Sequence, residues 1–196
     1  YSISVDNLSA SADNGLNLKD LKADYSRMTN GKQAFNLKLA SFNLADAHQY
    51  LELVPLPAAL QQQITAAAPQ GALENLVVNW QAANNVTTAY RINSKFNRLS
   101  IQAQDKIPGF NNLSGELKAN QKSGQLQLDS VNSMLDFKGI LRWPIPIDRL
   151  NGKVSWEIQD KATEINVNEL NISNPHITGT LNASYVLDGI KGGYLD

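Results

Sequence analysis

Few side chains in this sequence could do acid–base or metal chemistry. The two histidines, His48 and His176, fall in different regions, and the chain has no cysteine. A zinc site would therefore need carboxylates from distant strands, and a solvated or capping role is the better interpretation of each histidine. Neither a Gly-x-Ser-x-Gly motif nor a phosphate-cradling glycine loop is present.

Paired carboxylates are the remaining chemical candidates, because a glycoside hydrolase works with two of them. The candidates are Asp136, Asp148, Glu157 and Asp160. Alternation places Glu157 on a polar strand face, and Asp160 falls in a hairpin loop, where acidic residues are common. We therefore expect no enzyme activity, no metal site and no cofactor, and a glycan hydrolase is a distant alternative.

The composition favours one large β-rich domain. The chain has 196 residues and a net charge of −1 with both signs interspersed, so it carries no electrostatic footprint for nucleic acid. No apolar run approaches the roughly 20 residues of a membrane-spanning helix. The chain begins at Tyr1, within a predicted strand and without an initiator methionine. We expect residues 1–196 to be one segment of a longer protein, with any membrane anchor outside it.

A period of two dominates the sequence and predicts strands with one apolar face. The clearest apolar sets, each alternating with polar residues, are Leu113, Gly115, Leu117 and Ala119, then Leu150, Gly152, Val154, Trp156 and Ile158, and a third copy at Ile177, Gly179 and Leu181. All three sets place a glycine on the apolar face. Glycine there indicates bends or bulges that curve a sheet.

Matched apolar faces predict three hairpins. Tyr25 pairs with Phe35 if Thr29-Asn30-Gly31 is a three-residue loop that ends in a left-handed glycine. Two later hairpins match with four-residue loops at 121–124 and 159–162; the predicted pairs are Ala119 with Leu126, Leu117 with Leu128, Trp156 with Ile165, and Val154 with Val167. The alternation slips after Val167, which predicts a bulge at Asn168-Glu169.

The remaining segments are predicted from local signals. Helical spacing over 46–54, and again between Pro57 and Pro69, predicts two short helices, which either plug one end of a sheet or interact with a partner. Further strands are predicted over 2–10, 73–80, 89–93, 99–103, 135–141 and 177–187, with a frayed terminus over 189–196. Trp143-Pro144-Ile145-Pro146 is predicted to be an edge or crossing segment, because proline cannot donate to a central ladder.

About a dozen such strands predict a mainly β fold, a long curved antiparallel sheet folded into a trough with two short helices at one side. A sheet of this size curls, splits or closes. Its apolar face is covered either by its own other half, as in a sandwich, or by an apolar ligand. The scarcity of aromatic residues favours the open trough. The predicted lining residues are Leu117, Leu126, Leu128, Val154, Trp156, Ile165 and Val167.

The order of several short motifs resembles the periplasmic domain of AsmA-like proteins, above all the YhdP-type branch of Gram-negative bacteria. The motifs, between Leu53 and Trp156, are Leu56-Pro57 with Leu60, Ala68-Pro69-x-Gly71-x-Leu73-x-x-Leu76 leading to Trp80, then Tyr90, Phe96, Ile107-Pro108-Gly109, Leu113-Ser114-Gly115, Gly124-x-Leu126-x-Leu128 and Leu150-x-Gly152-x-Val154-x-Trp156.

The resemblance implies one segment of a periplasmic bridge, anchored in the inner membrane by an N-terminal helix outside this sequence. Such a bridge carries phospholipid through an apolar β-groove toward the outer membrane. Its implied partners are phospholipid acyl chains and the two membranes, with no nucleic acid. The alternative function is a structural or adhesive β-sandwich of a surface protein, which binds a protein or glycan through its loops.

Overall fold

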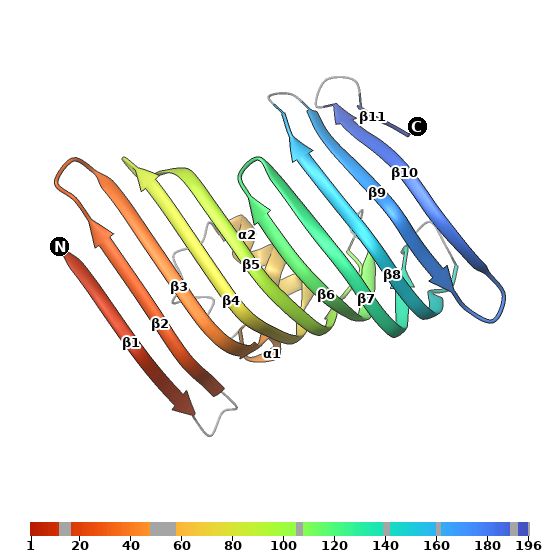
Figure 1. Cartoon of the computed structure of the whole chain (residues 1–196), viewed down its shortest axis with the longest axis horizontal. Coiled ribbons are helices and arrows are strands. Elements are labelled where there is room, and N and C mark those ends of the chain that lie inside the picture. Colours follow the sequence, from red (N-terminus) through yellow and green to blue (C-terminus); the bar gives the residue numbers. More distant parts are fainter. Residues whose placement is uncertain are drawn as a thin grey trace.

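The chain forms a single antiparallel sheet whose eleven strands lie side by side in the order of the sequence (Figure 1). The computed structural model describes residues 1–11, 17–47, 58–104, 108–138, 142–159, 162–188 and 192–195. The strands are β1 (Ser2–Ser11), β2 (Asn17–Arg27), β3 (Lys32–Asn43), β4 (Gln70–Ala83), β5 (Val86–Ile101), β6 (Gly109–Asn120), β7 (Ser123–Asp136), β8 (Ile145–Ile158), β9 (Ala162–Ser173), β10 (Thr178–Asp188) and β11 (Gly192–Leu195).

In the described part of the connection between β3 and β4, two short helices interrupt the meander. They are α1 (Leu44–Ala47) and α2 (Ala58–Ala67), and α2 lies behind β4 to β6 in Figure 1. The helix predicted between Pro57 and Pro69 is thus confirmed, and it ends before Pro69, which cannot continue a helix. Only Asp46 and Ala47 of the helix predicted over 46–54 belong to α1, and the rest lies outside the described residues.

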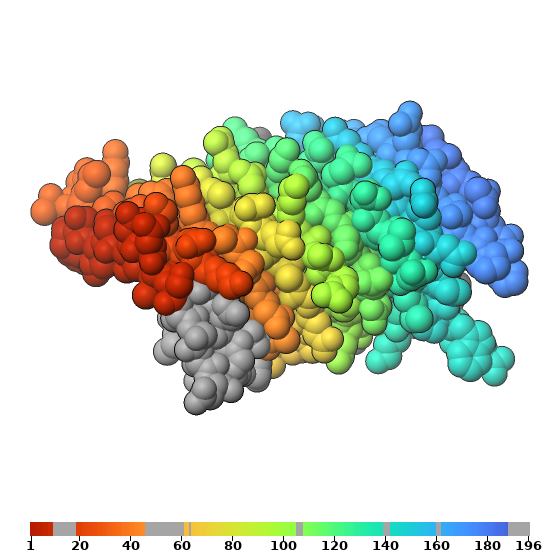
Figure 2. Space-filling model, turned by 60° about the horizontal axis from the view of Figure 1, so that its bottom comes forward, coloured from red at the N-terminus to blue at the C-terminus, as the bar shows by residue number. Residues whose placement is uncertain are grey.

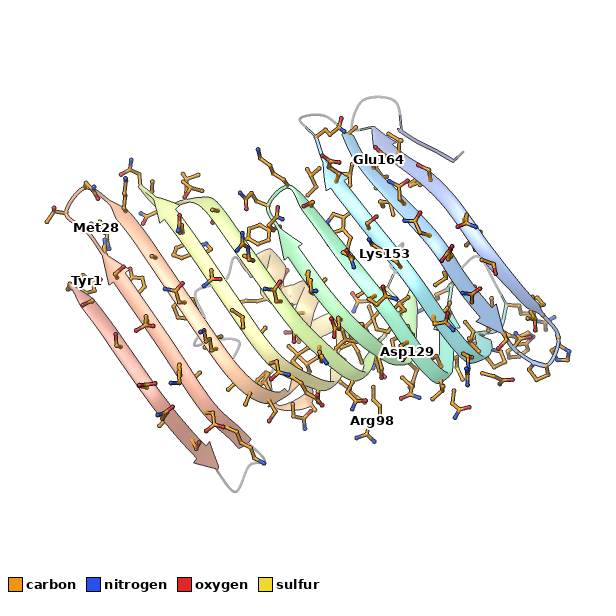
Figure 3. The ribbon with its side chains drawn as sticks, in the orientation of Figure 1. Tyr1, Met28, Arg98, Asp129, Lys153 and Glu164 are labelled. Carbon is orange, nitrogen blue, oxygen red and sulfur yellow. The ribbon has the colours of Figure 1, made fainter. Side chains whose placement is uncertain are left out.

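The sheet remains one open layer with two different faces. The polar face carries Asp129, Lys153 and Glu164, which Figure 3 labels in the same orientation as Figure 1, and the helices lie on the opposite, apolar side. The accessible area is 13191 Å², whereas a compact monomer of 21.5 kDa would expose about 9,200 Å². The two-layer sandwich considered as an alternative is therefore not the fold, and the curved open sheet is.

A line of β-bulges crosses the sheet and bends its lower part. Most strands carry one residue with positive φ where the register with a neighbour slips. These residues, which we call the bulge row, are Asn7, Asp20, Asn75, Arg98, Asn112, Asn132, Gly152 and Glu169. Because each slip shifts the alternation by one residue, apolar side chains stay on the same face above and below the row. The bulge predicted at Asn168-Glu169 is confirmed.

Serine side chains satisfy the backbone groups that these bulges release from the ladder. Ser130, which is 2% exposed, accepts a hydrogen bond from Ser114 N–H at 2.8 Å and donates one to Ser114 C=O at 3.0 Å. Ser133 donates to Asn112 C=O at 3.0 Å, and Ser94 donates to Glu74 C=O at 3.2 Å. All three serines are buried, and a buried backbone group without a partner would be costly.

The hydrophobic core lies along the bulge row, where the bend brings apolar side chains together. Its buried members are Phe96, Leu113, Leu128, Ile147 and Leu150, drawn from β5 to β8. Half-buried residues of β4 and β9, including Leu73, Leu170 and Ile172, pack against them. The sheet therefore builds its core in the corner of its own bend and leaves the upper part of the apolar face outside that core.

Two predicted hairpins have the expected register. Tyr25 pairs with Phe35, and Gly31 closes the loop in the left-handed region at φ 77°. In the hairpin of β8 and β9, Trp156 pairs with Ile165 and Val154 with Val167.

The register predicted for the hairpin of β6 and β7 is wrong by two residues. The structure pairs Leu117 with Leu126 and Ala119 with Gly124, around a two-residue loop. The reason is local: Asn120 Oδ1 accepts hydrogen bonds from the backbone N–H groups of Lys122 and Ser123, at 2.8 and 3.1 Å, and so closes a tight turn. A shift of two leaves each side chain on its predicted face.

Three other segment predictions are wrong. The strands predicted over 89–93 and 99–103 belong to the continuous β5, and the slip at Arg98 is a bulge within it. Of the strand predicted over 135–141, Leu135 and Asp136 are the end of β7, and residues 139–141 lie outside the described residues. Residues 192–195 of the terminus that was predicted to fray form β11, paired with β10. Pro146 lies in β8 and pairs with Met134 of β7. The pairing of β8 with β9 ends at Arg149, so Pro146 has a paired strand on one side only, which is where a strand tolerates proline.

Removing one serine hydroxyl tests whether the bulges depend on these hydrogen bonds. We expect Ser130→Ala to lower the free energy of unfolding by about 1–3 kcal/mol, because it leaves a buried N–H and a buried C=O of Ser114 without partners. Urea denaturation followed by circular dichroism measures the change. Ser155→Ala, on the polar face of β8, is the matched control and should change stability by less than about 0.5 kcal/mol; equal losses would contradict the account.

Candidate functional site

The most extended feature of the apolar face is a row of directly paired residues that crosses the sheet. We call it the central apolar row; it consists of Val5, Ala23, Leu37, Val78, Ile92, Ala119, Gly124, Trp156, Ile165 and Tyr185. It takes one residue from each strand from β1 to β10 and includes no charged side chain. With strands about 4.8 Å apart, it spans about 43 Å.

A second row runs parallel to the first. On each strand it lies two residues from the central row, on the side of the bulge row. It joins Leu117, Leu126, Val154, Val167 and Ala183 by direct pairing across β6 to β10. All five are half-buried. Together the two rows form a strip of apolar surface that runs perpendicular to the strands, outside the buried core.

The structure places all seven predicted lining residues on this face, but in two different environments. Trp156 and Ile165 belong to the central row, and Leu117, Leu126, Val154 and Val167 belong to the second row. Leu128 lies one pair lower, opposite Gly152, and is 6% exposed within the core cluster. Six of the seven therefore form one surface, and Leu128 supports it from the core.

Two glycines on this face lie beneath aromatic side chains of neighbouring strands. A Cβ atom at Gly124 would collide with the indole ring of Trp156, and one at Gly115 would meet the Phe96 ring at 2.9 Å and the Gln127 carbonyl oxygen. The aromatic rings thus lie over the glycines of neighbouring strands. Aromatic side chains commonly cover strand glycines in this way.

The apolar face also continues over β1 to β5, a part that sequence periodicity did not assign to the site. A further row of direct pairs contains Ile3, Tyr25, Phe35, Trp80 and Tyr90. The signal that would reveal it is the register between neighbouring strands. At the two sides of the sheet the apolar face reaches solvent, with Ile3, Leu8, Leu181 and Leu187 all exposed.

The structure assembles no acid–base or metal site from the chemical candidates. His176 is exposed in the turn between β9 and β10. Its backbone N–H, not its imidazole ring, donates to Asn174 Oδ1 at 2.9 Å. Asp136 ends β7 and exposed Glu157 lies near the opposite end of the sheet, paired with Ser123; Asp148 is exposed on β8. His48 and Asp160 lie outside the described residues, within which no cluster of three metal-ligating side chains occurs.

One titratable group on the apolar face has a shifted pKa. Desolvation, and then the neighbouring Tyr1, raise the pKa of the Tyr25 phenol above its usual value. The Tyr25 hydroxyl donates to Gln33 Oε1 at 3.2 Å. Because the shift is upward, Tyr25 stays protonated at neutral pH and supplies polarity rather than a base.

Comparison with known proteins gives one match. A family model described as YhdP protein matches residues 1–196. Searches of curated proteins and of solved structures found no match.

Alanine substitutions distinguish the core from the exposed strip. Leu128→Ala should lower the free energy of unfolding by about 2–5 kcal/mol, because it opens a cavity in the core. Ile165→Ala should cost about 1 kcal/mol, since a half-buried side chain gives up less apolar contact. Urea denaturation of both variants measures the difference, and equal losses would show that the strip is packed as tightly as the core.

Proposed function

The chain belongs to the YhdP protein family, an AsmA-like lipid-transport family that is not known as enzymatic, and on this basis we propose that it carries phospholipid on its apolar face. In this proposal residues 1–196 are one segment of a periplasmic β-groove that connects the inner and outer membranes. The acyl chains of the lipid contact the central and second apolar rows. The membranes are reached through parts of the protein outside this segment.

The observation that carries the proposal is the continuity of the central apolar row. Transport along a groove requires that each position offer a lipid the same kind of contact as the one before it. The row supplies one apolar residue per strand from Val5 on β1 to Tyr185 on β10, and each acyl methylene placed against such a surface gains on the order of 0.8 kcal/mol. A chain moving from one strand to the next exchanges one apolar contact for an equivalent one.

The absence of charge from the two rows supports movement rather than fixed binding. Trp156 lies over Gly124 within the central apolar row, whereas Phe96, which lies over Gly115, belongs to the buried core. The rows contain no charged side chain that would hold a headgroup at one position.

Membrane anchoring belongs to the same proposal. No helix in the described part of the chain has the length and apolarity that crossing a bilayer requires. We place the segment in the periplasm, with its anchor to the inner membrane elsewhere in the protein.

Two neighbouring substitutions of equal charge on opposite faces test the proposal. Val154→Asp introduces a carboxylate into the second apolar row and should reduce co-purifying phospholipid about tenfold, because acyl chains would have to desolvate the charge. Ser155→Asp adds the same charge to the polar face and should leave the lipid content unchanged. Mass spectrometry of lipid extracted from the purified chains measures both, with circular dichroism confirming that each is folded.

The proposal fails if the wild-type chain contains no phospholipid, or if Val154→Asp and the Ser155→Asp control retain equal amounts.

A further inference from the structure

A cavity opens at the lower edge of the sheet, below the bulge row. Its volume is about 720 Å³, and it lies between the segment after α2, the end of β5, the start of β6, the end of β7 and the segment before β8. We call it the rim cavity. Its lining combines apolar side chains with two cations; those used below are Ile101, Phe110, Met134, Asp136, Lys138 and Arg142.

The two cations of the rim cavity are available to an anion. Lys138 and Arg142 are both exposed, and neither forms an ion pair with any residue in the described part of the chain. Among the described residues of the lining, Asp136 is the one carboxylate, so their charged side chains sum to one positive charge. A phosphodiester carries one negative charge, and a guanidinium beside an ammonium offers both the forked and the point-charge mode of binding phosphate oxygens.

The apolar part of the rim cavity borders the core cluster. Ile101 pairs directly with Phe110, and Phe110 pairs with Leu135. Phe110 and Leu135 both pack against the core cluster. The cavity therefore joins a cationic edge to an apolar surface, and this arrangement matches an amphiphile rather than a free inorganic anion.

An exposed tryptophan beside the cavity supports the same orientation. Trp143 is 72% exposed, and the Arg142 guanidinium lies 5.5 Å from the centre of its ring. Figure 2 shows the segment at the start of β8, in teal, projecting from the body of the molecule. A tryptophan next to a cation is typical of the depth at which lipid headgroups meet acyl chains.

We infer that the rim cavity holds the phosphodiester headgroup of a phospholipid whose acyl chains lie toward the apolar face. Arg142 and Lys138 bind the phosphate oxygens, Ile101 and Phe110 contact the upper part of the chains, and Trp143 flanks the headgroup. This inference rests on the proposed phospholipid-carrying function and adds to it the position of the headgroup.

A pair of lipids that differ only in the phosphate-containing headgroup tests the inference. Dioctanoylphosphatidylglycerol and dioctanoylglycerol, each below its aggregation concentration, are titrated into the 196-residue chain by isothermal calorimetry. The phosphate-bearing lipid should bind about tenfold more tightly, which is what 1.4 kcal/mol of charge-assisted hydrogen bonding supplies. The double variant Lys138→Gln/Arg142→Gln should lose this preference and still bind dioctanoylglycerol as the wild type does.

The matched control removes two cations from the polar face. Lys38 and Arg91 are exposed and lie outside the rim cavity, so Lys38→Gln/Arg91→Gln should keep the tenfold preference. The inference is overturned if the wild type binds both lipids equally, if the rim variant keeps its preference, or if inorganic phosphate alone binds the wild type as tightly as the phospholipid does. Failure of the proposed function has a different signature, in which neither lipid binds.

Discussion

The bulge row and the hydrogen bonds that satisfy it are the constraint on which the rest of this structure depends. A flat sheet of this size would have no interior at all. By bending at Arg98, Asn112 and Asn132, the sheet brings apolar side chains from both sides of the bend into one buried cluster. The bend requires that backbone groups leave the ladder without losing their partners, and Ser130 and Ser133 provide those partners.

Because of this bend, the residues that stabilise the fold are largely different from the residues that form the exposed apolar surface. The cluster that holds the fold together lies along the bulge row, and the central apolar row lies outside it. In the second row, Leu117 and Leu126 pack against the cluster and remain half-buried. Single-layer sheets usually hide such a surface against another sheet or helices, and here α2 lies behind β4 to β6 only. An apolar strip that is continuous and carries no charged side chain is suited to a ligand that slides, which agrees with membership of a lipid-transport family.

Periodicity predicted which residues form strands and which face each one takes, because a period of two is a property of the chain alone. It also located the Thr29-Asn30-Gly31 loop and the bulge at Glu169. It could not fix the register of the β6–β7 hairpin, since registers two residues apart preserve the faces and the Asn120 side chain decides between them. The bulge at Arg98 shifts the alternation by one residue, and the continuous β5 was therefore predicted as two strands. The site was predicted from β6 to β9, whereas the aromatic residues of β2 to β5 join it only through pairing between neighbouring strands.

The central claim is that phospholipid chains touch one face of this sheet and not the other. Photo-crosslinking from adjacent residues tests it most directly, with a photoreactive side chain placed at Val167 on the apolar face or at Asn166 on the polar face, and phospholipid adducts identified by mass spectrometry. The account predicts adducts from position 167 and none above background from position 166. Equal labelling from both positions, or labelling from neither in the presence of phospholipid, would contradict it.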